Sequence, residues 1–316
     1  MITFFAPVRT FVGLFDILQR NAIASWKRAI PGAQVIILDR EDAVGAVCDE
    51  LGVEWVRDIP YDERFDRPYV GGLFAAAESR AVNDILCFIN GDNIMLDMLQ
   101  PIEQVKRRFQ RFCLVGERCN LKVEEVLDFD DPRTAAALKT RMQTEGWWSN
   151  EHAIDYFIYT KGSFGCVPRF LVGAGKMDNW LIQKAACTGL PLIDCGRRVI
   201  DIHQEHEERS FFETKYTTTN VLSPIRAVND REFALCQVAV GGGGLSSMLA
   251  ADWLMTADGF VPNPRSAPFG TRRSVARAFH RVPVANRLAI AAESAWYGFR
   301  RQAGGLVRRL GLRREA

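Results

Sequence analysis

The sequence predicts an α/β fold with a mixed, mainly parallel central sheet flanked by helices, followed by a basic helical tail. Two observations lead to this prediction. Short apolar runs alternate with segments of helical periodicity over the first third of the chain, which is typical of βαβ units with right-handed crossovers. The 316 residues include 48% hydrophobic and 25% charged residues. That balance is typical of a globular protein and excludes disordered and fibrous classes.

The first half of the chain alternates predicted strands with predicted helices. Each strand is a short apolar run, and each helix has apolar residues at helical spacing. The strands are expected over residues 2–8, 34–38, 54–59 and 85–89, and the helices over 14–30, 42–51 and 73–82. The fourth strand runs directly into polar residues after Ile89. Open α/β sheets bind ligands at the carboxyl ends of their strands, so we expect the functional site to begin there.

The order of elements is less regular in the second half. The expected helices are 96–109, 132–144, 178–188, 228–240 and 245–256, and the expected strands are 112–116, 153–159, a short one at Ile193, and 199–203. A glycine break separates the last two helices. We therefore expect three segments: a catalytic domain over 1–210, a helical extension that packs on it over 211–264, and a basic amphipathic tail over 265–316.

The tail differs from the rest of the chain in its charge. Residues 265–316 contain twelve arginines, no lysine and two glutamates, a net +10, whereas the whole chain has a net charge of +2 and the remainder is therefore −8. Arginine mixed with large apolar residues suits a helix on an anionic membrane surface. A tail bound to another partner and a disordered tail are equally open alternatives, and nucleic acid is the less favoured partner.

The cysteines and the hydropathy pattern bear on the compartment. Eight cysteines are scattered without a CxxC pair, several of them inside apolar runs, which favours reduced, buried thiols. No segment has the length and apolarity of a membrane-spanning helix, and the first residues lack the basic start of a signal peptide. We expect a cytoplasmic protein, held at the inner face of the membrane if the tail binds lipid.

Two polar segments are candidates for a metal site. Asn90, Gly91 and Asp92 follow the fourth strand, where a carboxylate could bind the divalent cation that accompanies a diphosphate. The alternative is an ordinary polar β-turn. His203 and His206 follow another predicted strand, and imidazole is a common metal ligand. The alternative there is a solvated, charged loop, and the spacing excludes the HExxH pattern of zinc proteases.

A third group of residues is expected on the acceptor side. Asp178, Asn179 and Trp180 begin a predicted helix, where the aspartate could accept a hydroxyl proton and the ring could pack on a sugar. Asp178 could instead be a helix N-cap. Asp155 lies in an apolar strand, where a charge needs a partner, and we take it as a second catalytic candidate. The neighbouring pair Trp147–Trp148 is core or sugar platform, with core favoured.

The remaining candidates surround the first two strands. Ala6 and Pro7 end the first strand, and Arg9 follows it as a candidate phosphate ligand, although most arginines simply face solvent. Asp39 ends the second strand, where acids in mononucleotide-binding folds often meet a ribose or base.

The order of these motifs resembles that of GT-A nucleotide-diphospho-sugar transferases of bacteria and plants over about residues 1–210. The matching stretches are Ser25-Trp26, 35–38, 86–92, 154–157, 177–181, Ile193-Asp194 and 202–206. The resemblance implies a single Rossmann-like GT-A fold with Mn²⁺ or Mg²⁺ as cofactor. It places Asp92 at the metal-binding acid of the DxD motif, with Asn90 replacing the first Asp. It also implies His203 or His206 as a late metal ligand and Asp178 as the acceptor-side base.

The expected activity is therefore transfer of a sugar from a UDP- or GDP-sugar to a hydroxyl of a glycan or lipid-linked acceptor, as in polysaccharide biosynthesis. A sugar-phosphate nucleotidyltransferase is the first alternative, but residues 6–10 lack the early glycine-rich loop that such enzymes show. A non-catalytic protein that binds glycans or nucleotides is the second alternative.

Overall fold

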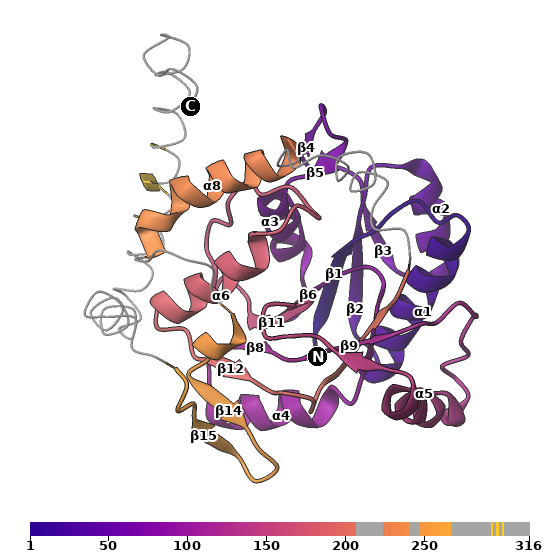
Figure 1. Cartoon of the computed structure of the whole chain (residues 1–316). Helices are drawn as coiled ribbons and strands as arrows, with labels where there is room; N and C mark the ends of the chain where they lie inside the picture. Colours follow the sequence, from indigo (N-terminus) through magenta and orange to yellow (C-terminus); the bar gives the residue numbers. More distant parts are fainter. Residues whose placement is uncertain (207–223, 241–246, 267–291, 293–294, 297–298, 300–316) are drawn as a thin grey trace.

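The protein is described from a computed structural model over residues 1–206, 224–240, 247–266, 292, 295, 296 and 299. A nine-stranded sheet forms its centre (Figure 1), in the order β15-β14-β12-β8-β11-β6-β1-β2-β3. Five of its eight strand pairs are parallel; the antiparallel pairs involve β11 and the edge hairpin β14–β15. The predicted α/β class with a mainly parallel central sheet is confirmed.

The strands of this central sheet are short, and all except β3, β14 and β15 are largely buried. They are β1 Thr3–Pro7, β2 Gln34–Leu38, β3 Glu54–Val56, β6 Ile85–Ile89, β8 Cys113–Val115, β11 Tyr156–Thr160, β12 Leu192–Asp194, β14 Trp253–Met255 and β15 Phe260–Pro262. Burial on both faces explains why β1 and β6 are continuous apolar runs, because helices cover both sides of a parallel sheet.

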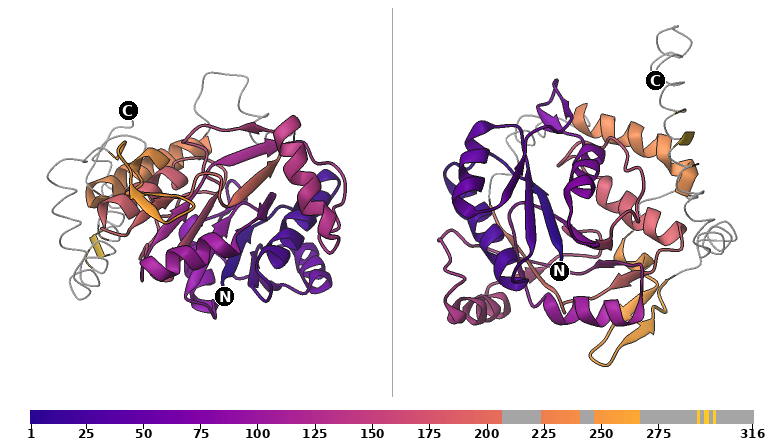
Figure 2. Two further views of the ribbon diagram at one scale, coloured as in Figure 1. Left: turned by 90° about the horizontal axis from the view of Figure 1, so that it is seen from below. Right: turned by 180° about the vertical axis from the view of Figure 1, so that it is seen from behind.

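Helices pack on both faces of the central sheet (Figures 1 and 2). On one face, α1 (Leu14–Ala29), α2 (Asp42–Leu51) and α4 (Leu99–Arg108) contribute to one apolar cluster. On the other, α3 (Val70–Arg80), α6 (Met177–Cys187) and α8 (Pro224–Val240) contribute to a second. The result is a three-layer arrangement, with the carboxyl ends of the parallel strands left for a site.

A second, four-stranded sheet lies beside the carboxyl ends of β1 and β6. Its order is β10-β9-β13-β7, and its strands are β7 Asn93–Leu96, β9 Arg118–Leu121, β10 Trp147–Trp148 and β13 Ile200–Gln204. One face is apolar and packs with α5 (Pro132–Thr144) in a cluster that includes Ile94, Cys119, Leu138 and Ile202. The opposite face is polar, because side chains alternate along each strand.

The structure departs from the sequence-based expectation in several elements. The helix expected over residues 245–256 is absent: η1 (Met248–Ala250) is a single 3₁₀ turn and β14 pairs with β12 in the central sheet. Strands β7, β9 and β10 and the small hairpin of β4 (Tyr61–Asp62) and β5 (Arg67–Pro68) were not expected. Strands β7, β9 and β10 are defined by long-range pairing, which local apolar periodicity does not report.

The expected tail lies almost entirely outside the described residues. Among the described residues, no helix is both long and apolar enough to cross a membrane. The division of the chain at residues 210 and 264 stays a prediction.

Candidate functional site

The turn that links β6 to β7 brings Asp92 to the end of the parallel strands. It is a β-turn closed by a backbone hydrogen bond from Asn93 to Asn90, and the Asn90 N–H donates to the carbonyl of Asp155. Gly91 packs against the end of β1, where a Cβ would lie 2.7 Å from the Pro7 carbonyl oxygen. The segment is therefore a β-turn that presents a carboxylate at the strand ends, and binding of a cation by that carboxylate stays a prediction.

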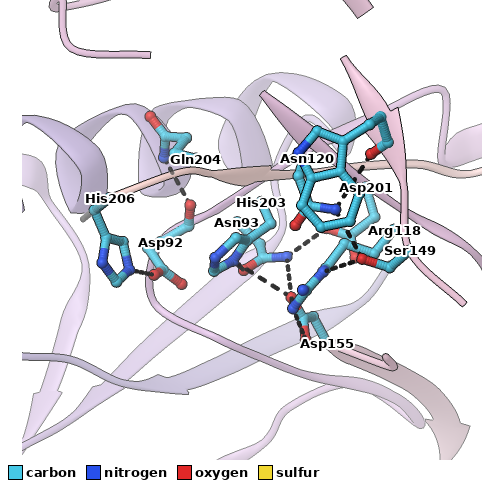
Figure 3. A network of polar contacts seen from close by, with 11 residues as sticks. Asp92, Asn93, Arg118, Asn120, Ser149, Asp155, Asp201, His203, Gln204 and His206 are labelled. Carbon is cyan, nitrogen blue, oxygen red and sulfur yellow. Dashed lines mark hydrogen bonds and ion pairs between the residues drawn. The ribbon is translucent and has the colours of Figure 1, made fainter. Parts of the chain in front are cut away.

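Asp92, His203 and His206 form a compact cluster (Figure 3). One ligand atom from each lies within 4.8 Å of the others, the separation at which three side chains can share one ion. His206 Nε2 lies 3.1 Å from Asp92 Oδ2, and the two imidazole rings are 5.6 Å apart between centroids. The three side chains are partly buried. The structure thus brings Asp92 together with two histidines that lie more than 100 positions later in the sequence.

The electrostatics of the cluster favour an ionised carboxylate. Burial alone would raise the pKa of Asp92, but the hydrogen bond with His206 and the charges of His203 and His206 outweigh burial and lower it. A carboxylate held ionised beside two imidazoles is a suitable set of donors for a divalent cation.

The polar face of the four-stranded sheet lies next to this cluster. In the register of the sheet, His203 lies opposite Asn93 on one side and Asn120 on the other, and Asn120 lies opposite Trp147. These four residues therefore form one row across the sheet. Asp201, two positions before His203 on β13, lies opposite Arg118, and both are on the same face as this row. The alternation of β13 sends Ile202 to the apolar face between them.

Asp155 is the centre of a polar network behind His203 (Figure 3). It precedes β11 and forms an ion pair of 2.9 Å with Arg118. The Asn93 amide bridges the two acids, 3.0 Å from Asp155 and 2.7 Å from Asp201. His203 Nδ1 lies 3.5 Å from Asp155 Oδ2. The predicted partner requirement of Asp155 is thus met mainly by Arg118.

Asp201 is fully buried within this network. Burial, followed by repulsion from Asp155, raises its pKa well above the ordinary value. Among the described residues, its Oδ2 has no hydrogen-bond partner. Because two neighbouring buried acids do not readily ionise together, a shared proton would keep the network close to neutral.

The backbone on both sides of the cluster is fixed by buried amide and indole groups. Gln204 donates 2.7 Å hydrogen bonds to the carbonyls of Asp92 and Leu18 and accepts from Asn21. The Trp26 indole N–H donates to the Asn93 carbonyl at 2.8 Å. Helix α1 is therefore joined by hydrogen bonds to both strands that carry the candidate ligands.

Asp178 lies in the first turn of α6, within electrostatic reach of the network. Burial raises its pKa to about 6, repulsion from Asp155 adds to the rise, and Arg118 opposes it. Asp178 is not the N-cap, because that position is Lys176, which has a φ of 71° and makes no side-chain capping bond. The N-cap alternative is therefore wrong.

The two tryptophan assignments are reversed by the structure. Trp180, expected to pack on a sugar, is only 2% exposed and lies in the core beside Phe170; Asn179 next to it is also buried. Trp147, for which core was favoured, is 53% exposed, whereas its neighbour Trp148 is partly buried and packs against the apolar cluster of the small sheet. Asp178, two positions earlier on α6, is only partly buried, since residues two apart on a helix point in different directions.

The candidates near the first two strands lie around the same edge. Arg9 places its guanidinium 4.3 Å from the centre of the Phe15 ring, and that ring is 5.0 Å from His206. Ala6 and Pro7 are buried in β1, so they contribute backbone rather than side chain. Asp39 follows β2, accepts a hydrogen bond from the Glu41 N–H, and has its pKa raised to about 6 by burial.

Sequence reasoning missed several residues of this site. Arg118, Asn93, Asn120 and Asp201 lie in short strands and provide the polar face of the four-stranded sheet. The alternation of polar and apolar residues in 200–204 was the available signal, because it predicts a strand with one polar face. Its partner strands β7 and β9 are four residues each, too short for alternation to be distinctive.

Neither a family model nor a curated protein matches this chain. Among solved structures, glucosyl-3-phosphoglycerate synthase from Mycobacterium tuberculosis with Mn²⁺, UDP-glucose and phosphoglyceric acid is 16% identical, with a TM-score of 0.41 over 68% of this chain and 74% of that chain. A putative glucose-1-phosphate thymidylyltransferase from Bacillus anthracis is 12% identical, with a TM-score of 0.32 over 52% of this chain and 73% of that one. Both similarities are remote.

Proposed function

We propose that this protein is a metal-dependent glycosyltransferase that transfers a sugar from a UDP- or GDP-sugar to a hydroxyl of a glycan or lipid-linked acceptor. The observation that carries the proposal is the cluster of Asp92, His203 and His206 at the carboxyl ends of β1 and β6. A departing nucleoside diphosphate carries negative charge, which a divalent cation neutralises. The order of sequence motifs, which is similar to that of GT-A transferases and includes these residues, also supports the proposal.

The donor set fits a divalent cation and favours Mn²⁺ over Mg²⁺. One carboxylate and two imidazoles are within reach of a single ion. Mg²⁺ prefers oxygen ligands alone, whereas Mn²⁺ is a transition metal that also accepts imidazole nitrogen. The lowered pKa of Asp92 keeps this ligand ionised at neutral pH. The ion would supply charge neutralisation for the diphosphate.

Asp155 acts in this proposal through His203. When Nδ1 of His203 donates toward Asp155, Nε2 is the ring nitrogen left to bind a metal. Carboxylates commonly orient metal-binding histidines in this way, and they fix the tautomer as well as the direction of the ring. The ion pair with Arg118 holds Asp155 in place. Asp155 is therefore a positioning residue rather than a group that contacts the substrate.

The donor nucleotide would lie across the ends of β1 and β2. Arg9 brings a cation close to His206 through their shared neighbour Phe15, which is a suitable position for a phosphate oxygen. Asp39 lies one strand further along the sheet and would accept a hydrogen bond from a ribose hydroxyl or a base.

Asp178 is the proposed base for the acceptor hydroxyl. With a pKa of about 6, it is mostly deprotonated at pH 7, yet more basic than an ordinary aspartate. A base whose pKa lies near the working pH accepts protons most effectively.

Thermal shift with nucleotides and metal tests the proposal directly. UDP, GDP, CMP and their sugars are each added with and without Mn²⁺, to wild type, to Asp92→Asn and to the exposed control Asp58→Asn. A ligand at 100 times its Kd stabilises the fold by about 2.7 kcal/mol, which is roughly 4 °C at an unfolding entropy of about 2.1 cal/mol/K per residue. We expect a metal-dependent shift with one nucleoside diphosphate in wild type and Asp58→Asn, and its loss in Asp92→Asn.

The reaction products distinguish the alternatives. Release of a nucleoside diphosphate from a nucleotide sugar supports the transferase. Release of pyrophosphate from a nucleoside triphosphate and a sugar phosphate would instead identify a nucleotidyltransferase. Metal-dependent nucleotide binding without any turnover would identify a non-catalytic binding protein, and a shift that persists unchanged in Asp92→Asn would refute the metal site.

A further inference from the structure

Trp147 is an exposed aromatic side chain whose position is fixed by hydrogen bonds. It is 53% exposed, and its indole N–H donates to Glu205 Oε1 at 2.7 Å. Its carbonyl accepts a hydrogen bond from the Asn120 side chain at 3.2 Å. Single exposed apolar residues are common and need no explanation by themselves. Here the indole is held in one orientation, so its ring face is presented to solvent in a defined direction.

The register of the small sheet places this ring next to the candidate metal site. Trp147 lies opposite Asn120 on β9, and Asn120 lies opposite His203 on β13. Directly opposed residues point to the same face of a sheet. Two strand spacings of about 4.8 Å put the backbone of Trp147 roughly 10 Å from that of His203. Trp147 and His203 thus belong to one surface and are separated by about the width of a small ring-shaped group.

The residues around the indole are polar. Glu205 is bound to the indole nitrogen through one oxygen, and a carboxylate can accept several more hydrogen bonds. Asn120 and Ser149 are hydrogen-bonded to each other beside it. A lipid chain needs a contiguous apolar surface, which this set does not provide. A sugar ring has an apolar face and a polar rim, and it matches an aromatic face bordered by a carboxylate and amides.

We propose that Trp147 and Glu205 form a saccharide subsite, in which the indole face packs against a pyranose ring of the acceptor and Glu205 accepts a hydrogen bond from its hydroxyls. The subsite rests on the proposed transferase function and narrows its acceptor to a carbohydrate. The nucleotide takes a different place, at the ends of β1 and β2, where Asp39 and Arg9 lie.

The test uses the indole N–H signals of the full chain, labelled with ¹⁵N-tryptophan. Seven tryptophans give at most seven signals, and Trp147→Phe identifies the one that disappears. Methyl glycosides of glucose, galactose, mannose, rhamnose, glucuronic acid and N-acetylglucosamine are titrated individually. We expect at least one to shift the Trp147 signal, with its affinity, measured by calorimetric titration, retained within a few-fold in Trp147→Phe and reduced about tenfold in Trp147→Ala. Leu99→Ala, an exposed apolar residue on α4, should leave the affinity unchanged.

A second titration separates this proposal from the proposed function. Mn²⁺ is paramagnetic, so ion at the Asp92 cluster should broaden the Trp147 signal through its proximity, and UDP or GDP with Mn²⁺ should still raise the melting temperature of Trp147→Ala. If nucleotide and metal bind but no glycoside shifts the Trp147 signal, or if Trp147→Ala binds glycosides like wild type, the subsite is refuted and the transferase stands. A shift of the Trp147 signal by nucleotide alone, without glycoside, also overturns the subsite. Absence of any metal-dependent nucleotide binding in wild type counts against the proposed function instead.

Discussion

The close packing of Gly91 against β1 makes a quantitative prediction for Gly91→Ala. A Cβ at this position would lie 2.7 Å from the Pro7 carbonyl oxygen and 3.1 Å from Val8 Cγ1, whereas ordinary contact begins at 3.4 Å. The larger overlap, about 0.7 Å, falls on main-chain atoms of the central sheet, which cannot rotate away. Overpacking of this kind typically costs about 1–3 kcal/mol of folding free energy, which corresponds to a melting temperature lowered by roughly 1.5–5 °C for a chain of this length.

The same displacement should also weaken metal binding, because Asp92 is the next residue. Metal–ligand distances tolerate deviations of about 0.2 Å, so a shift of several tenths of an ångström is expected to weaken Mn²⁺ binding by about tenfold or more. Calorimetric titration with Mn²⁺ measures the affinity, and thermal unfolding measures the stability.

Gly45→Ala is the matched control for this variant. Its Cβ would lie 2.5 Å from the Trp55 ring, on helix α2 away from the cluster, so it should lower stability while leaving Mn²⁺ affinity unchanged. Wild-type stability together with wild-type Mn²⁺ affinity in Gly91→Ala would show that the close approach does not constrain the turn. Equal losses of affinity in both variants would show that the effect is general destabilisation.

Three further predictions concern Asp178, His203 and Trp26. Asp178→Asn should lower turnover by about 10²–10⁴-fold with donor binding retained. Wild-type turnover should rise with pH through about 6, because the raised pKa of Asp178 leaves its carboxyl protonated below that value. A flat pH profile would contradict the role of Asp178 as base. The pKa of Asp178 is about 6 in the folded protein, against an ordinary value of 3.8, so ionisation of Asp178 destabilises the folded state as the pH rises from 3.8 to about 6. Asp178→Asn should therefore be at least as stable as wild type at pH 7, and a lower melting temperature of this variant would contradict the effect of burial. His203→Ala should abolish the Mn²⁺-dependent thermal shift, and the exposed control His152→Ala should not; similar behaviour of the two would remove His203 from the site. Trp26→Phe removes the buried hydrogen bond to the Asn93 carbonyl and should cost about 1–3 kcal/mol in chemical denaturation, so an unchanged unfolding midpoint would show that the bond contributes little.

Prediction from the sequence succeeded for elements that local residue patterns define. The strand ending at Ile89, the helix over residues 132–144 and the polar turn with Asp92 are all observed as expected, because each depends on apolar periodicity or on turn-forming residues. The presence of His203 and His206 near Asp92 is also observed, although their binding of a metal stays a prediction.

The parts that failed depend on contacts distant in sequence. Whether Trp147 or Trp180 is exposed is decided by which element covers each ring, and both lie in segments rich in aromatic and apolar residues. Residues 253–255 were assigned to a helix because their apolar neighbours allow helical spacing, but pairing with β12 makes them a strand. Tertiary pairing of this kind overrides local preference, so one sequence alone does not report it.

The two-faced strand β13 has a consequence for how this chain tolerates change. Strand side chains alternate with a period of two. A one-residue insertion or deletion that shifts β13 against β7 and β9 would therefore turn Ile202 toward the site and turn His203 toward the apolar face, where its imidazole would be buried against α5. Such an indel would turn His203 away from the site without any substitution of the histidine itself. The partners of β13 lie about 80 and 110 positions earlier, so a ribosome must complete synthesis through residue 206 before the cluster can assemble. Any truncated chain that ends before β13 is expected to lack metal affinity, however well its first three strands have folded.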